Sequence, residues 1–150
     1  MLERVVFRVG DPLYRQSVAL RYRVLREPLG LQFTENELLK DHPDLHYGLL
    51  HHNELMACLT LSEGDQGLKM RQVAVRPDVQ HQGWGRMLCL WAEEQAIGRG
   101  YDRIFCHARQ AVVLFYHRLG YVEKGPVFEE VGIPHLFMEK NGLNADKSQQ

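Results

Sequence analysis

The sequence predicts an α/β fold in which a mixed, mostly antiparallel sheet is flanked by helices on both faces. Three observations support this: consecutive apolar runs joined by short turns, a strand-helix-strand segment, and amphipathic stretches at helical spacing. Short connections join antiparallel neighbours, whereas a helical crossover makes the two strands it connects parallel. Packing helices on both sides is the simplest way to bury such a sheet.

The first part of the chain is predicted to hold one strand and two helices. Residues 4–9 are rich in β-branched side chains and end at Gly10-Asp11-Pro12, a pattern that starts helices. Residues 13–26 carry an imperfect apolar stripe, and Pro28 ends that helix. Residues 35–40 form a second, short candidate helix.

The middle of the chain is predicted to form three consecutive strands. Residues 46–51 and 55–61 are apolar runs joined by His52-Asn53-Glu54, which predicts a hairpin. A turn at residues 63–67 leads into a third strand over residues 68–75.

The remaining segments alternate between helix and strand. They are a helix over residues 86–98, a strand over 103–107, a helix over 111–119, a final strand pair over 121–124 and 135–139, and a polar tail over 141–150. We therefore expect one domain over residues 1–140, followed by a tail with no core to join.

Composition narrows the function classes. With 150 residues, 45% of them hydrophobic, the chain suits one globular domain, and its formal charge of −1 gives no general attraction to nucleic acid or to an anionic membrane. The N-terminus lacks the apolar core of a signal peptide and no run is long enough to cross a bilayer, so we expect a cytoplasmic protein.

Cysteines and histidines do not form a metal-binding pattern. Cys58, Cys89 and Cys106 lie in separate apolar runs without a Cys-x-x-Cys pair, which predicts buried, reduced thiols. The neighbours His51 and His52 would point to opposite faces of a strand. We expect no metal site.

The segment Gln80-His81-Gln82-Gly83-Trp84-Gly85 predicts a phosphate-binding loop, because it joins an apolar strand to a helix. Glycines let the backbone approach a ligand closely, and the first N–H groups of a helix bind anions. No Lys-Ser or Lys-Thr follows, which argues against a nucleotide triphosphatase loop, and no Gly-x-Gly-x-x-Gly opens a dinucleotide unit. The alternative is that the glycines serve only a turn.

A second motif lies one strand later, where Phe115-Tyr116 is followed by Gly120-Tyr121. Together, the loop and this segment resemble, in order and spacing, the pyrophosphate loop and the tyrosine-bearing helix of GNAT N-acetyltransferases. The resemblance spans residues 45–140. The ending over residues 127–138, with Glu129-Glu130 before Gly132-Ile133-Pro134-His135, is similar to the terminal hairpin of the ElaA-like branch.

The resemblance implies a cofactor site for acetyl-CoA as co-substrate and no metal. The pyrophosphate would lie on the backbone of the loop, and the pantetheine would pair with the preceding strand. These residues are Val73, Ala74, Val75, Gln80, His81, Gln82, Gly83, Trp84, Gly85 and Arg86. Arg109 stands where many members have Asn, and its permanent charge would contact a phosphate or an acidic group of the substrate instead.

The resemblance also implies acetyl transfer to a primary amine by direct attack. A main-chain N–H at Val73 or a neighbour would stabilise the oxyanion, and Tyr116 would protonate the departing sulfur as general acid. His107, at the end of its strand, is our candidate general base. His46, Glu129 and His135 are further candidates, each with the alternative of being a polar residue at the rim, and Arg71 and Gln72 would orient substrate or water.

The acceptor is not encoded in any pattern that we can interpret. It is a small-molecule, peptide or protein amine, its site is expected in residues 13–43 and 125–134, and a homodimer through an edge strand is open. Two other functions compete with the enzyme: a non-catalytic acyl-CoA-binding sensor that has lost turnover, and a structural domain that binds no coenzyme A.

Overall fold

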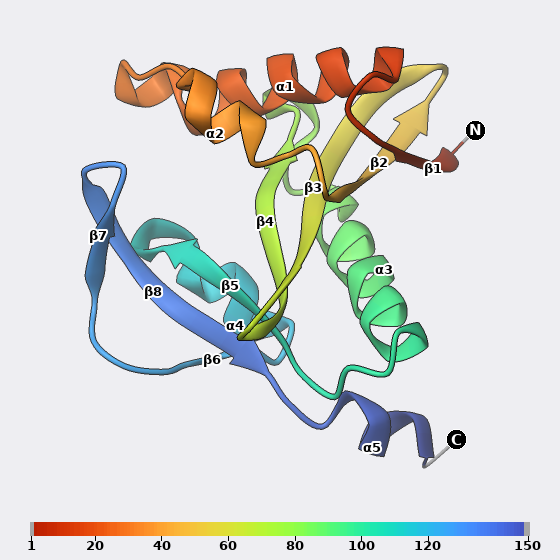
Figure 1. Cartoon of the computed structure of the whole chain (residues 1–150), viewed down its shortest axis with the longest axis vertical. Helices are drawn as coiled ribbons and strands as arrows, with labels where there is room; N and C mark the ends of the chain where they lie inside the picture. Colours follow the sequence, from red (N-terminus) through yellow and green to blue (C-terminus); the bar gives the residue numbers. More distant parts are fainter. Residues whose placement is uncertain (1, 149–150) are drawn as a thin grey trace. The chain divides into compact units, whose positions relative to one another are not determined.

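The computed structural model describes residues 2–148, which form two compact units (Figure 1). The first unit holds the chain up to Ser62 together with Met70–Ala92, and the second holds Glu63–Lys69 together with the chain from Glu93 onward. Three elements contribute residues to both units: β3 (Glu54–Gly64), β4 (Gly67–Val75) and α3 (Trp84–Gly98).

The sheet of the first unit is built mainly from local pairings. β1 (Leu2–Phe7), β2 (Leu45–His51) and β3 pair antiparallel in chain order, and β4 follows β3. The β2–β3 hairpin turns at His52 and Asn53, whose φ values of 52° and 64° suit a two-residue hairpin turn. The predicted hairpin is confirmed.

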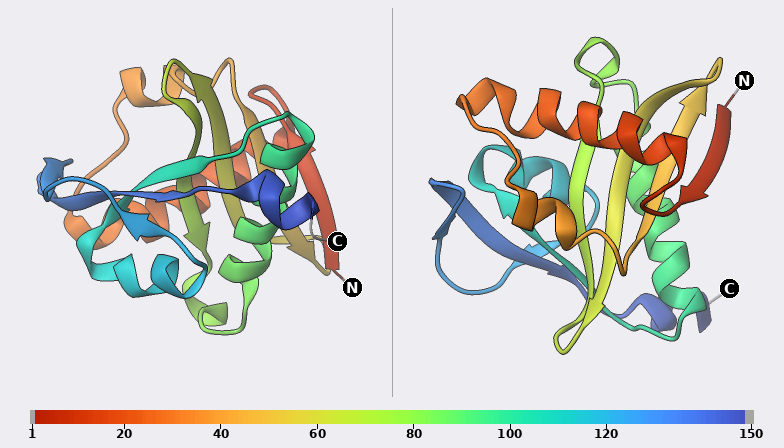
Figure 2. Two further views of the ribbon diagram at one scale, coloured as in Figure 1. Left: turned by 90° about the horizontal axis from the view of Figure 1, so that it is seen from below. Right: turned by 45° about the horizontal axis from the view of Figure 1, so that its top comes forward.

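One face of this sheet packs against α1 (Pro12–Leu25), which Figure 2 shows lying across the strands. The Asp11 side chain starts the helix by accepting a hydrogen bond from the Leu13 N–H at 2.9 Å. Leu20 of α1 packs in a core cluster with Leu50 and Cys58. A 3-10 turn, η1 (Glu27–Leu29), and the short α2 (Glu35–Leu39) follow, and Thr34 and Glu37 cap α2 reciprocally.

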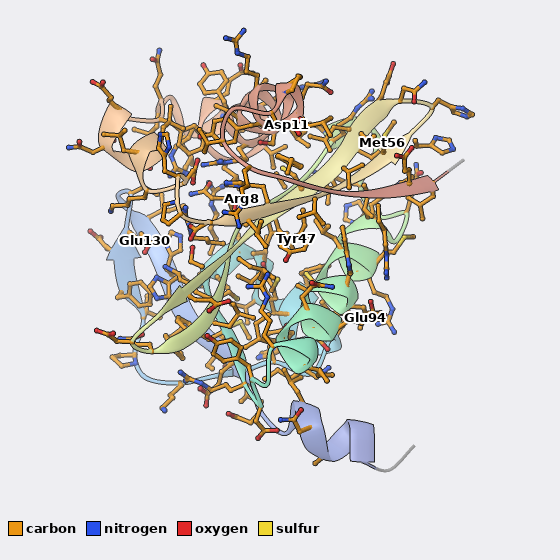
Figure 3. All side chains as sticks on the ribbon, turned by 45° about the vertical axis from the view of Figure 1, so that its right-hand side comes forward. Arg8, Asp11, Tyr47, Met56, Glu94 and Glu130 are labelled. Carbon is orange, nitrogen blue, oxygen red and sulfur yellow. The ribbon has the colours of Figure 1, made fainter. Side chains whose placement is uncertain are left out.

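The opposite face packs against the first part of α3. Because side chains alternate along β2, Tyr47, labelled in Figure 3, lies on the opposite face of the strand from Leu50. The Tyr47 ring meets the edge of the Trp91 ring of α3 at a centroid distance of 5.0 Å. Helices therefore cover both faces of the first unit's sheet, as predicted.

A buried network of charges joins α1 to the segment after α2 and to β4. Arg21 and Asp41, 1% and 0% exposed, form an ion pair at 2.8 Å. The Asp41 carboxylate also accepts from Arg71 at 2.6 Å and from the Tyr14 hydroxyl at 2.7 Å. Burial alone would raise the pKa of Asp41, but the charge of Arg21 and hydrogen bonds from Tyr14 and Arg21 outweigh it and lower the pKa.

The second unit contains the predicted parallel pair. β5 (Ile104–Arg109) pairs in parallel with the start of β4, where Leu68 lies opposite Ile104. β8 (Ile133–Lys140) pairs antiparallel with β5, and the short β6 (Val122–Glu123) pairs antiparallel with β8. This arrangement of mostly antiparallel strands flanked by helices confirms the predicted fold class.

β7 (Phe128–Glu130) is a strand that the residue pattern alone did not predict. It pairs antiparallel with β8 and forms the terminal hairpin that the ElaA-like resemblance implied. Its turn is formed by Val131 and Gly132, whose φ values are 48° and 78°. Three residues ending in an acidic pair carry too little periodicity to indicate a strand.

The two faces of β5 differ in what covers them. Cys106 faces α4 (Val113–Arg118), a helix that follows the 3-10 turn η3 (Gln110–Val112). The hydroxyl of Tyr116 on α4 donates a hydrogen bond to the Cys106 sulfur. His107 points to the opposite face, where Phe137 of β8 is its register partner. That second face carries aromatic and charged side chains.

The end of the chain differs from the predicted polar tail. α5 (Leu143–Ser148) begins with Leu143, which is 2% exposed, and the Leu143 N–H donates to the Asp102 carbonyl oxygen at 3.0 Å. The Asp102 carboxylate also accepts from the Asn144 N–H. A single apolar residue thus packs into the second unit, and residues 149–150 lie outside the described part of the chain.

Among residues 2–148, none of the helices is long and apolar enough to cross a membrane. Within the same residues, no group of three or more His, Cys, Asp or Glu side chains could hold a metal ion. Cys58, Cys89 and Cys106 are all buried and reduced, as predicted.

Candidate active site

The predicted phosphate loop lies in the first unit, between β4 and α3. After β4, a 3-10 turn, η2 (Pro77–Val79), leads into Gln80, whose side-chain amide donates to the Val75 carbonyl oxygen at 3.2 Å. Gly83 has a φ of +91°, which side chains disfavour, and a Cβ built there would meet no atom within 4 Å. The backbone angle therefore requires the glycine, and the space beside it is open.

The start of α3 provides anion-binding groups at this loop. The helix begins at Trp84, so its first amide N–H groups have no partner in a preceding turn and carry the positive end of the helix dipole. His81, Gln82 and Arg86 are exposed, whereas the Trp84 ring is half-buried and lies 5.8 Å from the His51 ring. The loop combines exposed backbone with one exposed cation, which suits a phosphate ligand.

β4 contains a strained residue that the sequence analysis did not identify as such. Gln72 has a φ of 57°, a left-handed value in the middle of a strand, and such strain costs about 1–3 kcal/mol. Its Oε1 atom is buried and has no hydrogen-bond partner among the described residues. The following Val73 is half-buried, while Ala74 is buried in the core beneath α1. The only sequence signal is the polar pair Arg71-Gln72 inside an apolar strand.

Arg71, which we expected to orient substrate or water, is held by polar side chains of the first unit. Its Nη2 atom donates to Asp41 at 2.6 Å and to Asp44 at 3.2 Å, and its Nε atom donates to Ser62 at 2.8 Å. The charge of Arg71 is therefore matched by carboxylates of the first unit.

Tyr116 lies in the second unit, on α4. It is 6% exposed, and the rings of Phe115 and Tyr121 meet it at centroid distances of 5.0 and 5.6 Å. Its hydroxyl bonds the Cys106 sulfur. Burial raises the pKa of Cys106 to about 12, more than the hydrogen bond from Tyr116 lowers it, so Cys106 is a neutral thiol and not a nucleophile.

His107 forms a polar cluster on the other face of β5. Its Nδ1 atom lies 2.9 Å from Glu130 Oε1 on β7 and 3.3 Å from Lys69 Nζ on β4. The hydrogen bond to His107 lowers the pKa of Glu130 more than burial raises it, so Glu130 is a carboxylate at neutral pH. The Lys69 ammonium can only donate, so Nδ1 cannot serve both groups at once; when it donates to the nearer Glu130, Nε2 is the basic nitrogen.

The structure selects Glu130 rather than Glu129 as the partner of His107. Side chains alternate along β7, so Glu130 shares the face of His107 and Glu129 does not. We named Glu129 alone as a base candidate, because the implied hairpin did not indicate which acidic residue shares the face of His107. The useful signal would have been alternation counted outward from the Val131-Gly132 turn.

The remaining base candidates are more enclosed. His46 is 1% exposed, and both ring nitrogens are occupied, Nδ1 by Thr60 at 2.9 Å and Nε2 by the Asp41 carbonyl oxygen at 3.1 Å. Burial lowers the pKa of His46. His135 is 4% exposed, and its Nδ1 atom lies 3.0 Å from the Ile133 carbonyl oxygen. Each histidine therefore forms a hydrogen bond with a backbone carbonyl oxygen.

The predicted site residues thus fall into three groups. Val73 to Arg86 lie in the first unit, along β4, the loop and the start of α3. His107 and Arg109 lie in the second unit on one face of β5, and Tyr116 lies on the other. The two catalytic candidates therefore do not contact each other.

Comparison with known proteins decides the family. The profile of the Acetyltransferase (GNAT) family matches residues 13–121, most of the chain. The chain belongs to the GNAT family. It is therefore an acyltransferase, and the resemblance that the loop and the Tyr116 segment indicated is confirmed.

Relatives of this GNAT protein are similar over almost their full length. YitI of Bacillus subtilis, named an uncharacterized N-acetyltransferase, is 27% identical, and the match covers 93% of this chain and 96% of YitI. The crystal structure of Escherichia coli ElaA superposes with a TM-score of 0.81 at 19% identity, covering 94% and 100% of the two chains. An acetyl-CoA-bound GNAT acetyltransferase from Elizabethkingia anophelis gives a TM-score of 0.70 at 16% identity, covering 93% and 97%. These two structural likenesses concern the fold.

Proposed function

We propose that this GNAT enzyme transfers the acetyl group of acetyl-CoA to a primary amine of a small molecule, a peptide or a protein. The observation that carries the proposal is the loop between β4 and α3, where Gly83 adopts a left-handed angle beside open space at a helix N-terminus. Such a loop fits a pyrophosphate, and the bound acetyl-CoA of the Elizabethkingia relative is consistent with this ligand class.

The loop residues would bind the co-substrate mainly through the backbone. The N–H groups from Gln80 to Arg86 would receive the pyrophosphate, with the Gln80 side chain holding the loop to Val75. The pantetheine would pair with the main chain of Val73 and Val75, and buried Ala74 anchors that strand from behind. Arg109 would add a positive charge for a phosphate or an acidic substrate group.

The chemistry requires three groups besides the two substrates. The amine nitrogen attacks the thioester carbonyl carbon, and the developing oxyanion accepts a hydrogen bond from the Val73 N–H. The C–S bond then breaks, and coenzyme A leaves as a thiolate that takes a proton from Tyr116. Before the attack, the substrate ammonium gives up one proton to His107, which Glu130 orients through Nδ1. The nitrogen loses its second proton as the intermediate collapses, and this proton restores the Tyr116 hydroxyl.

Two glycine variants test the phosphate-binding loop between β4 and α3. We expect acetyl-CoA at a hundred times its dissociation constant to stabilise the protein by about 2.7 kcal/mol, and Gly83→Ala to remove most of that gain. Gly100 is the control, because it also has a left-handed φ, +86°, and open space for a Cβ. Both variants should lose about 1 kcal/mol of stability without ligand, from the disfavoured angle.

The readout is the melting temperature with and without acetyl-CoA, coenzyme A, NAD or ATP. The proposal expects a shift with the two coenzyme A ligands alone, retained in Gly100→Ala and weakened in Gly83→Ala. If coenzyme A produced no shift in the unmodified protein, the loop would be only a turn and the proposal would fail.

The His107–Glu130 pair makes a separate prediction about the base. Glu130→Gln should lower kcat about tenfold, because the neutral amide no longer stabilises a protonated His107. Glu129→Gln, which removes the same charge from the adjacent position on the other face of β7, should change kcat less than about twofold if its charge has no part in the chemistry.

A double variant tests whether Glu130 acts through His107. If Glu130 acts through His107, then His107→Gln combined with Glu130→Gln should be no slower than His107→Gln alone. Additive losses, or equal losses in the Glu129 and Glu130 variants, would contradict the assignment. Steady-state kinetics over a pH series supplies the measurement.

A further inference from the structure

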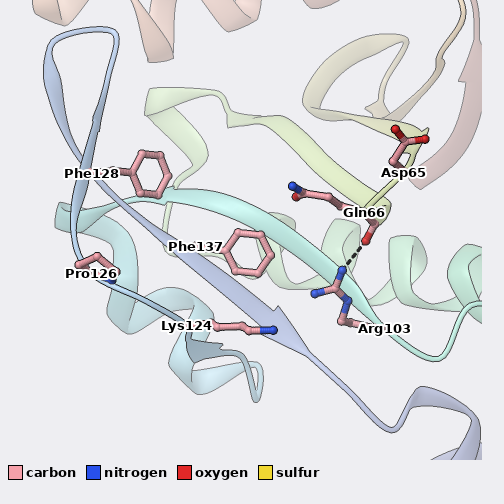
Figure 4. A pocket seen from close by; sticks show the side chains of 7 residues that line it. All are labelled: Asp65, Gln66, Arg103, Lys124, Pro126, Phe128 and Phe137. Atoms are coloured by element: carbon pink, nitrogen blue, oxygen red, sulfur yellow. Dashed lines mark hydrogen bonds between the residues drawn. The ribbon is translucent and has the colours of Figure 1, made fainter.

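The face of β5 and β8 that carries His107 also holds a pocket, which lies wholly within the second unit (Figure 4). The half-buried rings of Phe128 and Phe137 form its apolar wall, and the turn before β4 and the segment after β6 form its rim. Its other lining residues are Asp65, Gln66, Arg103, Lys124 and Pro126.

The pocket adjoins the proposed base. The His107 ring lies 5.1 Å from the ring of Phe128, edge to face, and 5.9 Å from that of Phe137, measured between centroids. Both rings also line the pocket. A molecule whose amine reaches His107 would therefore lay its next few atoms against Phe128 and Phe137.

The aromatic wall is held rigidly. Phe137 stacks on Phe105 at 4.9 Å with an interplanar angle of 14°, and the Arg103 guanidinium lies over the rings of Phe105 and Phe137 at 5.1 and 5.8 Å. Arg103 is held in turn by Glu139 at 2.7 Å and by the Gln66 carbonyl oxygen. A flat apolar group would find a preformed surface, which lowers the entropy cost of binding.

The charges around the pocket favour an acidic ligand. Lys124 is anchored by its backbone N–H, which donates to the Phe137 carbonyl oxygen at 2.8 Å. Its ammonium makes no hydrogen bond or close ion pair with the described residues, and its charge acts at longer range on Glu139, the carboxylate that pairs with Arg103. Figure 4 shows the Lys124 side chain directed toward Arg103, the Gln66 amide directed toward the rings, and the Asp65 carboxylate directed away from them. The cationic side of the pocket is thus available and the acidic residue is not aimed into it.

We propose that this pocket binds the body of the acceptor, and that the acceptor is an amine joined to a carboxylate by a flat apolar spacer. The amine lies at His107, the spacer lies on Phe128 and Phe137, and the carboxylate meets Lys124. This inference rests on the proposed acetyl transfer, because that reaction brings the amine to His107.

Two matched acceptors test the role of the carboxylate. The unmodified enzyme should bind para-(aminomethyl)benzoate with a KM about fivefold lower than the KM for para-(aminomethyl)benzamide, as expected for one partly exposed charge pair. Lys124→Gln should bring the two KM values together. Arg8→Gln, which removes an exposed cation from the first unit outside the expected acceptor region, should keep the difference.

A binding measurement without the amine separates the pocket from the chemistry. Ligand-observed NMR with para-methylbenzoate should detect binding to the unmodified protein and about fivefold weaker binding to Lys124→Gln. If para-methylbenzoate bound in this way but neither amine was acetylated, the pocket assignment would stand and the proposed reaction would be excluded for this class of amine. Equal binding to both proteins, or equal KM values for the acid and the amide in the unmodified enzyme, would overturn the pocket assignment.

Discussion

Replacing Tyr116 with Phe should lower kcat by about ten- to a thousandfold while leaving the acetyl-CoA-induced stabilisation intact. The hydroxyl is the only group lost, and in the structure it already donates a hydrogen bond to a sulfur atom, that of Cys106. A thiolate leaving group presents a sulfur with a full negative charge, which is a stronger acceptor than a neutral thiol. The measurement is coenzyme A release under saturating conditions.

Tyr121→Phe is the matched control for this variant. Tyr121 packs against Tyr116, but its hydroxyl donates to Glu93 at 3.0 Å, so its loss should cost about 1 kcal/mol of stability and leave kcat within about twofold. The loss of kcat in Tyr116→Phe should also be smaller when para-nitrophenyl acetate replaces acetyl-CoA as the acetyl donor, because its leaving group needs no proton. An unchanged kcat for Tyr116→Phe would remove the general-acid role.

Replacing Asp41 with Asn should destabilise the protein by about 3–5 kcal/mol, because it leaves the buried Arg21 charge without its carboxylate. Arg21 is 1% exposed, so water cannot take the place of that partner. For a chain of this length the melting temperature should fall by roughly 10 °C. Urea unfolding followed by circular dichroism gives the free energy directly.

Asp78→Asn is the control, because Asp78 forms a similar ion pair with Arg76 at 2.7 Å but is 53% exposed. We expect a much smaller loss for that surface pair, because water screens its charges. Since the pKa of Asp41 is lowered in the folded state, its stabilisation is fully present above the ordinary pKa of an aspartate and is lost as the pH falls through its folded value. Equal losses in the two variants would contradict the buried network.

Features set by neighbouring residues were predictable from the sequence. The β2–β3 hairpin follows from two apolar runs around His52-Asn53-Glu54, and the parallel pairing of β4 with β5 follows from a helical crossover. The family could also be read from local motifs, because the loop glycines and the Tyr116 segment lie in short stretches.

Features set by distant residues were not predictable. Arg21 resembles any helix-surface cation until Asp41, twenty positions later, folds back to meet it. Glu130 meets His107 only because the local β7–β8 hairpin lies beside β5, and the long-range pairing of β8 with β5 is not encoded by any local pattern. The left-handed angle of Gln72 interrupts a strand whose composition is ordinary.

The most direct test of the proposed reaction is transfer of an isotopically labelled acetyl group. The protein is incubated with acetyl-CoA labelled in the acetyl carbons and a panel of primary amines, including amino acids with aromatic spacers, and the products are analysed by mass spectrometry. The account predicts a labelled N-acetyl product, with one coenzyme A released per acetyl group transferred. Tight acetyl-CoA binding with no labelled amine and no amine-dependent release of coenzyme A would contradict it.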